Sequence, residues 1–284
     1  MQTWFTHIAR LLGAAAGTFA GVVAVQLMRL RRMEFLPGHP GFYVNHTVLP
    51  TAAEDRGRGR LRLVVLGDST TAGVGVDRAE DSLPYQLAQR LADHHRRPVH
   101  VVSYGWAGAR MVDLVEDQLP RAGTPLRSGE AAPFLAGADL VALVIGSNDA
   151  THQTPPWRFR RDLRAALHQV RTAAPDARVV LAGIPAFRGA LRAFEPLIFI
   201  ADQYARPLRR VARAEAEEAG AAYADLAAEV PRRIDRDTPF LSRDRFHPSR
   251  VGYAIWADVI FEALVTGPPP ARPAVDAPME PAGT

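Results

Sequence analysis

The chain has 284 residues, which is enough for one domain with further segments at its ends. The net charge is +4, and the basic residues, all of them arginine, are scattered among acidic residues. This distribution argues against a nucleic-acid-binding protein, which needs a clustered basic surface with aromatic side chains. There is no cysteine, which excludes disulfide bonds and metal sites built from thiolates.

The first predicted element is a helix over residues 11–28, LLGAAAGTFAGVVAVQLM, a run without any charged residue. Eighteen helical residues span about 27 Å, close to the roughly 30 Å hydrocarbon core of a bilayer. Arg10 precedes the run, and Arg29, Arg31 and Arg32 follow it. We therefore expect residues 1–32 to form a single-pass membrane anchor, with the rest of the chain in the cytoplasm.

Other interpretations of this segment remain open. It could be a secretory signal peptide with Val22 and Ala24 before the cleavage site, although three arginines soon afterwards argue against export; the domain would then be extracytoplasmic or secreted. Gly13, Gly17 and Gly21 lie on one helix face, where they would allow close contact between two copies in a homodimer. The same spacing also arises by chance in a segment rich in alanine and glycine.

Proline, glycine and charged residues dominate the two segments that flank the remaining sequence. Residues 33–60 include the run EDRGRGR and are predicted to be a linker that is partly ordered at best. Residues 266–284 are rich in proline and are predicted to be a disordered tail. The folded domain is therefore expected over residues 61–265.

Within the expected domain, apolar runs of strand length alternate with helical patterns. Strands are predicted at 61–66, 99–103, 139–145, 178–184 and 221–226, and helices at 83–95, 109–119, 157–173, 195–219 and 249–265. The strand runs are almost continuously apolar, which is typical of parallel strands buried on both faces. The sequence thus predicts a three-layer α/β/α sandwich with a mainly parallel, five-stranded sheet of the flavodoxin-like kind.

Four segments in this pattern carry candidate functional residues. In such a sheet, ligands bind outside the carboxyl ends of the strands. The first strand leads into GDS, which ends at Ser69; SYGWAGAR, with Gly108, follows the second strand; and GSND, with Asn148, follows the third. DRFHPS, with Asp244 and His247, precedes the last helix.

Together these four segments resemble the SGNH/GDSL family of serine hydrolases, over about residues 61–265. The resemblance implies an esterase or lipase in which Ser69 is the nucleophile, His247 the base and Asp244 the group that orients the imidazole. It also implies an oxyanion hole formed by the backbone N–H groups of Ser69 and Gly108 and the side-chain amide of Asn148. Leucine is usual in the family's motif where Thr70 stands here, a departure that bears on the pocket floor.

These residue types suit acyl transfer, although each of them, taken alone, could have a purely structural role. A serine hydroxyl becomes nucleophilic when a base takes its proton, imidazoles titrate near neutral pH, and a carboxylate stabilises the charged imidazole. Pro248 disfavours a helical conformation at the preceding histidine, so DRFH is expected to be a loop. Alternatively, Ser69 could cap a turn, Asn148 could be a turn residue, and Asp244 and His247 could form a surface ion pair.

Motifs of several other site classes are missing from the sequence. There is no HxH or HExxH pattern for a metal, no GxGxxG or P-loop for a nucleotide, and no GxSxG elbow, so we expect neither metal nor cofactor. The predicted function is hydrolysis of a small-molecule or lipid ester through an acyl-serine intermediate. Acyl transfer to an alcohol, or a catalytically silent membrane-tethered binding module, are the alternatives. Residues 186–210 are either a lid or an ordinary amphipathic helix that packs on the sheet.

Overall fold

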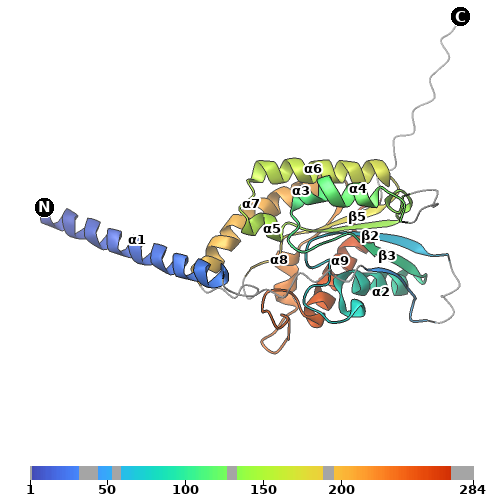
Figure 1. Cartoon of the computed structure of the whole chain (residues 1–284), viewed down its shortest axis with the longest axis horizontal. Coiled ribbons are helices and arrows are strands. Elements are labelled where there is room, and N and C mark those ends of the chain that lie inside the picture. Colours follow the sequence, from blue (N-terminus) through green and yellow to red (C-terminus); the bar gives the residue numbers. More distant parts are fainter. Residues whose placement is uncertain (1, 32–43, 53–58, 127–132, 188–194, 270–284) are drawn as a thin grey trace, which may run out of the picture.

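The computed structural model describes residues 2–31, 44–52, 59–126, 133–187 and 195–269. In these ranges a six-stranded sheet lies between two layers of helices (Figure 1). The strands are β1(Asn45–Val48), β2(Leu61–Gly67), β3(Val99–Ser103), β4(Leu140–Val144), β5(Arg178–Ala182) and β6(Ala222–Ala224). Their order across the sheet is β1-β3-β2-β4-β5-β6.

The five strands β2 to β6 are parallel and correspond to the five strands predicted from the sequence. Because they are parallel, their carboxyl ends meet at one edge of the sheet. Side chains alternate between the two faces of the sheet, and both faces are buried. Val64 of β2 belongs to the hydrophobic cluster on one face, and its neighbour Val65 belongs to the cluster on the other. This burial explains why the strand sequences are almost continuously apolar.

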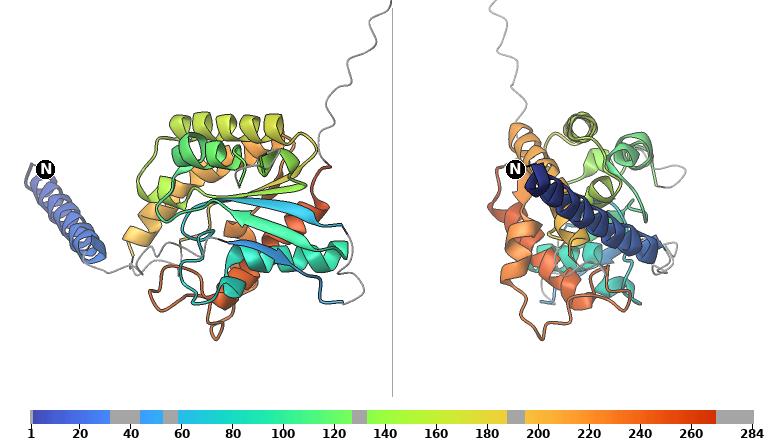
Figure 2. Two further views of the ribbon diagram at one scale, coloured as in Figure 1. Left: turned by 45° about the vertical axis from the view of Figure 1, so that its right-hand side comes forward. Right: turned by 90° about the vertical axis from the view of Figure 1, so that its left-hand side faces the viewer.

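Helices cover both faces of the sheet (Figure 2). The longer ones that pack on it are α2(Leu83–His95), α6(Pro156–Ala173), α7(Leu197–Glu218) and α9(Arg250–Thr266), all close to the predicted ranges. The predicted helix at 109–119 is instead three consecutive turns, α3(Met111–Asp113), η3(Leu114–Gln118) and α4(Leu119–Ala122), the middle one π-helical. Short helical segments complete the body: η2(Ala79–Asp81), η4(Leu135–Gly137), α5(Ser147–Thr151), α8(Leu226–Glu229) and η5(Val230–Arg232).

Each helix layer has its own core. Leu163 and Leu167 of α6 and Leu208 of α7 pack on the face that carries Val64. On the other face, α2 and α9 pack on the side that carries Val65, through leucines of α2 and Tyr253 and Ile260 of α9. The sheet is thereby fixed from both sides, which makes its carboxyl edge a rigid platform for the loops that follow the strands.

The linker predicted at 33–60 contains a strand that the sequence analysis missed. Residues 45–48 form β1, which pairs antiparallel with β3, so that the sheet is mixed and has one strand more than expected. Val44 and Val48 are buried in the core beside this strand. Residues 32–43 and 53–58 of the linker, and most of the predicted tail, lie outside the described residues.

The N-terminal hydrophobic segment is helical, as expected, in α1(Gln2–Arg31), which projects away from the α/β body (Figure 1). Nowhere in the described part of the chain, however, does a helix combine the length and the apolar character needed to cross a membrane. Eight of the residues at 11–28 are alanine or glycine, which contribute little hydrophobicity. The predicted single-pass anchor, and the cytoplasmic placement inferred from it, are therefore not supported.

Candidate active site

Ser69 follows the end of β2 at the carboxyl edge of the sheet. Gly67 is required there, because a Cβ atom on it would lie 2.2 Å from the carbonyl oxygen of Val144. The next side chain, Asp68, folds the turn: its Oδ1 accepts hydrogen bonds from the backbone N–H of Thr70 at 3.0 Å and from the Thr70 hydroxyl at 2.8 Å. This turn leaves Ser69 half-buried, with its side chain in a cavity.

The structure brings Ser69 together with a histidine 178 positions later in the chain. His247 Nε2 lies 3.0 Å from Ser69 Oγ, and His247 Nδ1 lies 2.6 Å from Asp244 Oδ2. The three side chains therefore form one hydrogen-bonded series, and both His247 and Asp244 are buried. This burial excludes the alternative in which Asp244 and His247 are an exposed surface ion pair.

Asp244 is held ionised by its surroundings. Burial disfavours its charged form, but the His247 ring, the Ser242 hydroxyl and the backbone N–H groups of Phe246 and His247 all donate to it and together lower its pKa. A carboxylate fixed in this way can hold the imidazole in one orientation and stabilise its protonated form.

The segments proposed for the oxyanion hole lie beside each other. Asn148 Nδ2 donates to the carbonyl oxygen of Ala109 at 2.9 Å, and a primary amide has a second N–H to donate. Gly108, next to Ala109, has a φ of +90°, a conformation that favours glycine. Gly105 has a different role, since a Cβ atom on it would lie 1.8 Å from Thr71 Oγ1.

Two buried side chains that the sequence analysis did not assign to the site support these loops. Asp149 Oδ2 accepts from the backbone N–H of Met111 at 2.9 Å, which ties the loop containing Gly108 to α5. Burial raises the pKa of Asp149 to about 6. Gln118 clamps the end of β2, because its amide accepts from the N–H of Gly67 at 2.8 Å and donates to the carbonyl of Gly67 at 2.7 Å.

Asp68 is a second carboxylate close to the histidine. Burial raises its pKa, although hydrogen bonds from Thr70 and the attraction of His247 oppose that shift. Its two hydrogen bonds from Thr70 hold the turn after β2. Thr70, at the position where the family usually has leucine, therefore acts through Asp68 and also lines the cavity.

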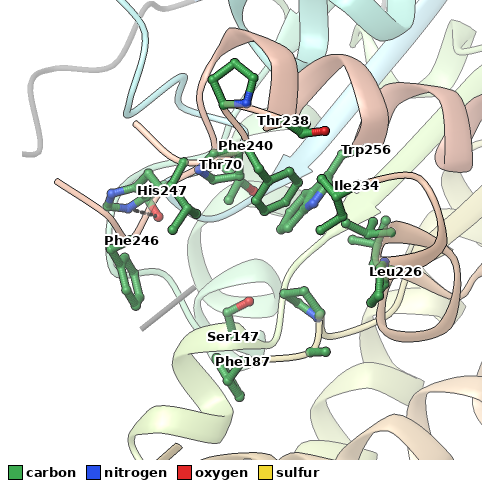
Figure 3. A pocket seen from close by; sticks show the side chains of 18 of the residues that line it. Thr70, Ser147, Phe187, Leu226, Ile234, Thr238, Phe240, Phe246, His247 and Trp256 are labelled. Carbon is green, nitrogen blue, oxygen red and sulfur yellow. Dashed lines mark hydrogen bonds between the residues drawn. The ribbon is translucent and has the colours of Figure 1, made fainter. Parts of the chain in front are cut away.

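A cavity of about 500 Å³ opens at Ser69, Asn148 and His247 (Figure 3). Most of its walls are apolar, and they come from four parts of the chain: the loop after β5, α8 and η5 with the segment that follows, the loop that carries His247, and α9. The apolar residues that line it include Phe187, Leu226, Val230, Ile234, Phe240, Leu241, Phe246 and Trp256.

The other candidates from the sequence contribute little to this cavity. Of the possible lid at 186–210, residues 197–210 belong to α7, which packs on the sheet beside α6; Ala186 and Phe187 line the cavity, and residues 188–194 lie outside the described residues. In the described ranges, we find no group of three or more histidine, aspartate or glutamate side chains that could hold a metal ion.

A family model for the GDSL-like lipase/acylhydrolase family matches residues 65–255. The chain belongs to this family. A GDSL-like esterase of Mycobacterium tuberculosis is 28% identical over 208 residues, which cover 72% of this chain and 62% of that protein. The chain thus spans less than two thirds of the length of this GDSL relative.

Solved structures of lipases share the fold. A lipase from a goat rumen metagenome superposes with a TM-score of 0.57 at 18% identity, covering 72% of this chain and 97% of the other. The lipase/acylhydrolase of Enterococcus faecalis gives a TM-score of 0.54 at 21% identity, covering 75% and 100%. These two matches establish the α/β fold, and membership of the GDSL family supports hydrolase activity of the esterase or lipase type.

Proposed function

We propose that this GDSL-family protein hydrolyses carboxylic esters through an acyl-serine intermediate. The observation that supports the proposal is the series Ser69 Oγ, His247 Nε2, His247 Nδ1 and Asp244 Oδ2, with separations of 3.0 Å and 2.6 Å. Distances of this size are those of a nucleophile, a general base and an orienting group. The name of the mycobacterial relative, an esterase, agrees with this chemistry.

In the first step, His247 Nε2 takes the proton of Ser69 as Oγ attacks the ester carbonyl carbon. The carbonyl oxygen becomes negative and accepts hydrogen bonds from the backbone N–H groups of Ser69 and Gly108 and from Asn148 Nδ2. Asp244 stays ionised and stabilises the imidazolium. His247 then gives the proton to the departing alkoxide, which leaves as the alcohol.

In the second step, water takes the place of the alcohol beside His247. His247 removes a proton from the water, whose oxygen attacks the carbonyl carbon of the acyl-serine. The same donors hold the oxyanion, and His247 returns the proton to Ser69 Oγ as the carboxylic acid leaves. An alcohol in place of water at this step would give acyl transfer, which product analysis in the presence of an alcohol detects.

The decisive test is labelling with a fluorophosphonate probe, combined with hydrolysis of p-nitrophenyl acetate and butyrate. We expect Ser69→Ala to abolish labelling and to lower kcat by at least about a thousandfold, because the nucleophile is lost. Ser147→Ala is the matched control, since it removes another hydroxyl from the same cavity. Retained turnover in Ser69→Ala, or a wild-type protein that the probe does not label, would disprove the proposal.

A further inference from the structure

The cavity at Ser69 extends away from the reacting groups. In Figure 3, His247 and Phe246 lie at one end, and Ile234, Leu226 and Trp256 lie toward the other. Taking the proposed ester hydrolysis as given, we propose that this cavity holds the acyl chain of the substrate, and that the preferred acyl groups are unbranched chains of about six to ten carbons.

The size of the cavity sets the length of the chain. A methylene group takes up about the volume of one water molecule in the liquid, roughly 30 Å³. A chain that fills half of the 500 Å³ therefore has about eight carbons. A long-chain fatty acyl group would have to leave the cavity at its far end, where the indole of Trp256 and the side chain of Ile234 stand.

The chemistry of the walls favours a plain alkyl chain. Residues 234–241 form the outer wall of the cavity. Two of its polar side chains are paired with each other, since the Thr238 hydroxyl donates to Asp235 Oδ1 at 2.6 Å, and the backbone N–H of Asp237 donates to the same oxygen at 3.1 Å. Apart from Arg236, which is exposed, the remaining lining near them is aromatic, aliphatic or proline, as in Phe240 and Pro239. Each methylene placed against such walls raises kcat/KM by about fourfold, until the cavity is full.

The two-step reaction indicates which half of the ester occupies the cavity. The acyl group stays bonded to Ser69 through both steps, whereas the alcohol must depart so that water can reach the same place beside His247. A deep apolar cavity suits the part that stays. The loop with Gly108 and the half-exposed Trp106 does not line the cavity, which leaves that side of Ser69 for the alcohol.

Hydrogen bonds and an ion pair within the protein hold the outer wall of the cavity in place. Ser249 N–H donates to the carbonyl of Phe240 at 2.8 Å, and Ser242 N–H donates to the carbonyl of His247 at 2.9 Å. Arg233 forms a two-pronged ion pair with Glu262 of α9, with distances of 2.9 Å and 2.6 Å. These bonds hold the segment with Ile234 over α9, so the depth of the cavity is a property of the folded protein.

The test compares two ester series: p-nitrophenyl esters of acids from two to sixteen carbons, and acetates of alcohols from two to ten carbons. For the wild-type protein, kcat/KM should rise with acyl length to a maximum at about six to ten carbons and depend only weakly on alcohol length. A flat or falling acyl profile overturns the proposal, whatever the variants do.

Two variants should move the maximum in opposite directions. Ile234→Trp fills the far end of the cavity from a half-buried loop position, so kcat/KM for the octanoate should fall at least about tenfold, since loss of two methylene contacts alone removes about sixteenfold. Hydrolysis of the acetate should fall much less than that of the octanoate, because a two-carbon acyl group does not reach that end. Trp256→Leu deepens the cavity and should shift the maximum to longer acids.

Val251→Trp is the matched control, since it adds the same side chain to an exposed position of α9 that does not line the cavity. It should keep the wild-type acyl profile. An Ile234→Trp protein with an unchanged acyl profile, or with a changed alcohol profile instead, overturns the acyl assignment. In either case, fluorophosphonate labelling and acetate hydrolysis by the wild-type protein still report on Ser69, so the proposed function is judged separately.

Discussion

Asp149 is a buried carboxylate that supports the proposed oxyanion hole and whose ionisation opposes folding. It is 1% exposed, and burial raises its pKa to about 6 despite hydrogen bonds from Met111 and Thr154. Because its pKa is higher in the folded protein than in the unfolded chain, the native state binds the proton more tightly. The stability that this supplies is complete at low pH and is lost as the pH rises through about 6.

Asp149→Asn should therefore change how stability depends on pH. Between pH 4 and pH 8 the wild-type protein should lose about 2 kcal/mol relative to the variant, because ionising Asp149 costs stability in this range and the variant has no carboxyl group to ionise. Urea unfolding of both proteins at several pH values measures this difference. Parallel stability curves would show that Asp149 does not titrate with a raised pKa.

A variant that lacks a hydrogen-bond acceptor at this position should slow the reaction. In Asp149→Leu the oxygen that accepts from Met111 N–H, three residues after Gly108, is lost, so the Gly108 loop should shift. We expect kcat to fall at least about tenfold with little change in KM, since a misplaced oxyanion donor acts on the transition state. Asp162→Leu is the control, because Asp162 is a buried carboxylate paired with Arg161; equal losses in both variants would contradict the proposed role.

At the scale of the element, the end of β2 depends on one side chain from η3. Gln118 is fully buried and pairs with both the N–H and the carbonyl group of Gly67, two residues before Ser69. A strand that turns sharply at its end leaves such backbone groups without ladder partners, and a buried unpaired group is expensive. The amide side chain, which has both a donor and an acceptor, satisfies the two groups at once.

Gln118→Met tests how much the two hydrogen bonds of this clamp stabilise the folded protein. It keeps the size of the side chain but leaves both polar groups of Gly67 unpaired, so the free energy of unfolding should fall by about 2–5 kcal/mol. Gln169→Met, on the half-buried side of α6, should change it by less than about 1 kcal/mol. Chemical denaturation measures both, and similar values for the two variants would show that the clamp contributes nothing.

The periodicity of the sequence predicted the helices and parallel strands well, because each buries a continuous apolar pattern. It failed at η3, where five residues adopt a π-helical turn within a predicted helix, and nothing in the local pattern marks the pairing of Gln118 with a residue 51 positions earlier. The four strand-end motifs led to Ser69, Asn148, Asp244 and His247. The sequence analysis did not assign Asp149 to the site, because its contact with Met111 depends on the tertiary fold.

At the scale of the whole molecule, the least predictable part of the sheet is its antiparallel edge. β1 has the sequence NHTV, and three of its four residues are exposed, so it lacks the pattern of a buried strand. It exists because β3 offers an edge for pairing, with Val48 opposite Val99. The cavity could not be predicted from the sequence either, because its walls come from segments between residues 68 and 256 that meet only after folding.

Two N-terminal truncations should separate the contribution of α1 to stability from that of β1. A protein that starts at residue 33 keeps β1, and its melting temperature and esterase activity should match those of the full chain. A protein that starts at residue 61 loses the buried Val44 and Val48 and uncovers the edge of β3, so it should melt at least about 5 °C lower or aggregate. Thermal unfolding and size-exclusion chromatography report both results, and equal melting temperatures would mean that β1 is dispensable.

The loop that carries His247 follows directly on the outer wall of the cavity, along one uninterrupted stretch from Pro231 to Pro248. An insertion or deletion in this stretch would displace His247, the proposed base, together with the wall. Such changes should therefore lower turnover as well as alter the acyl preference. Trp256 stands outside it, on a helix packed against α2. Substitution at Trp256 should therefore change the preferred acyl chain of the proposed reaction without displacing His247.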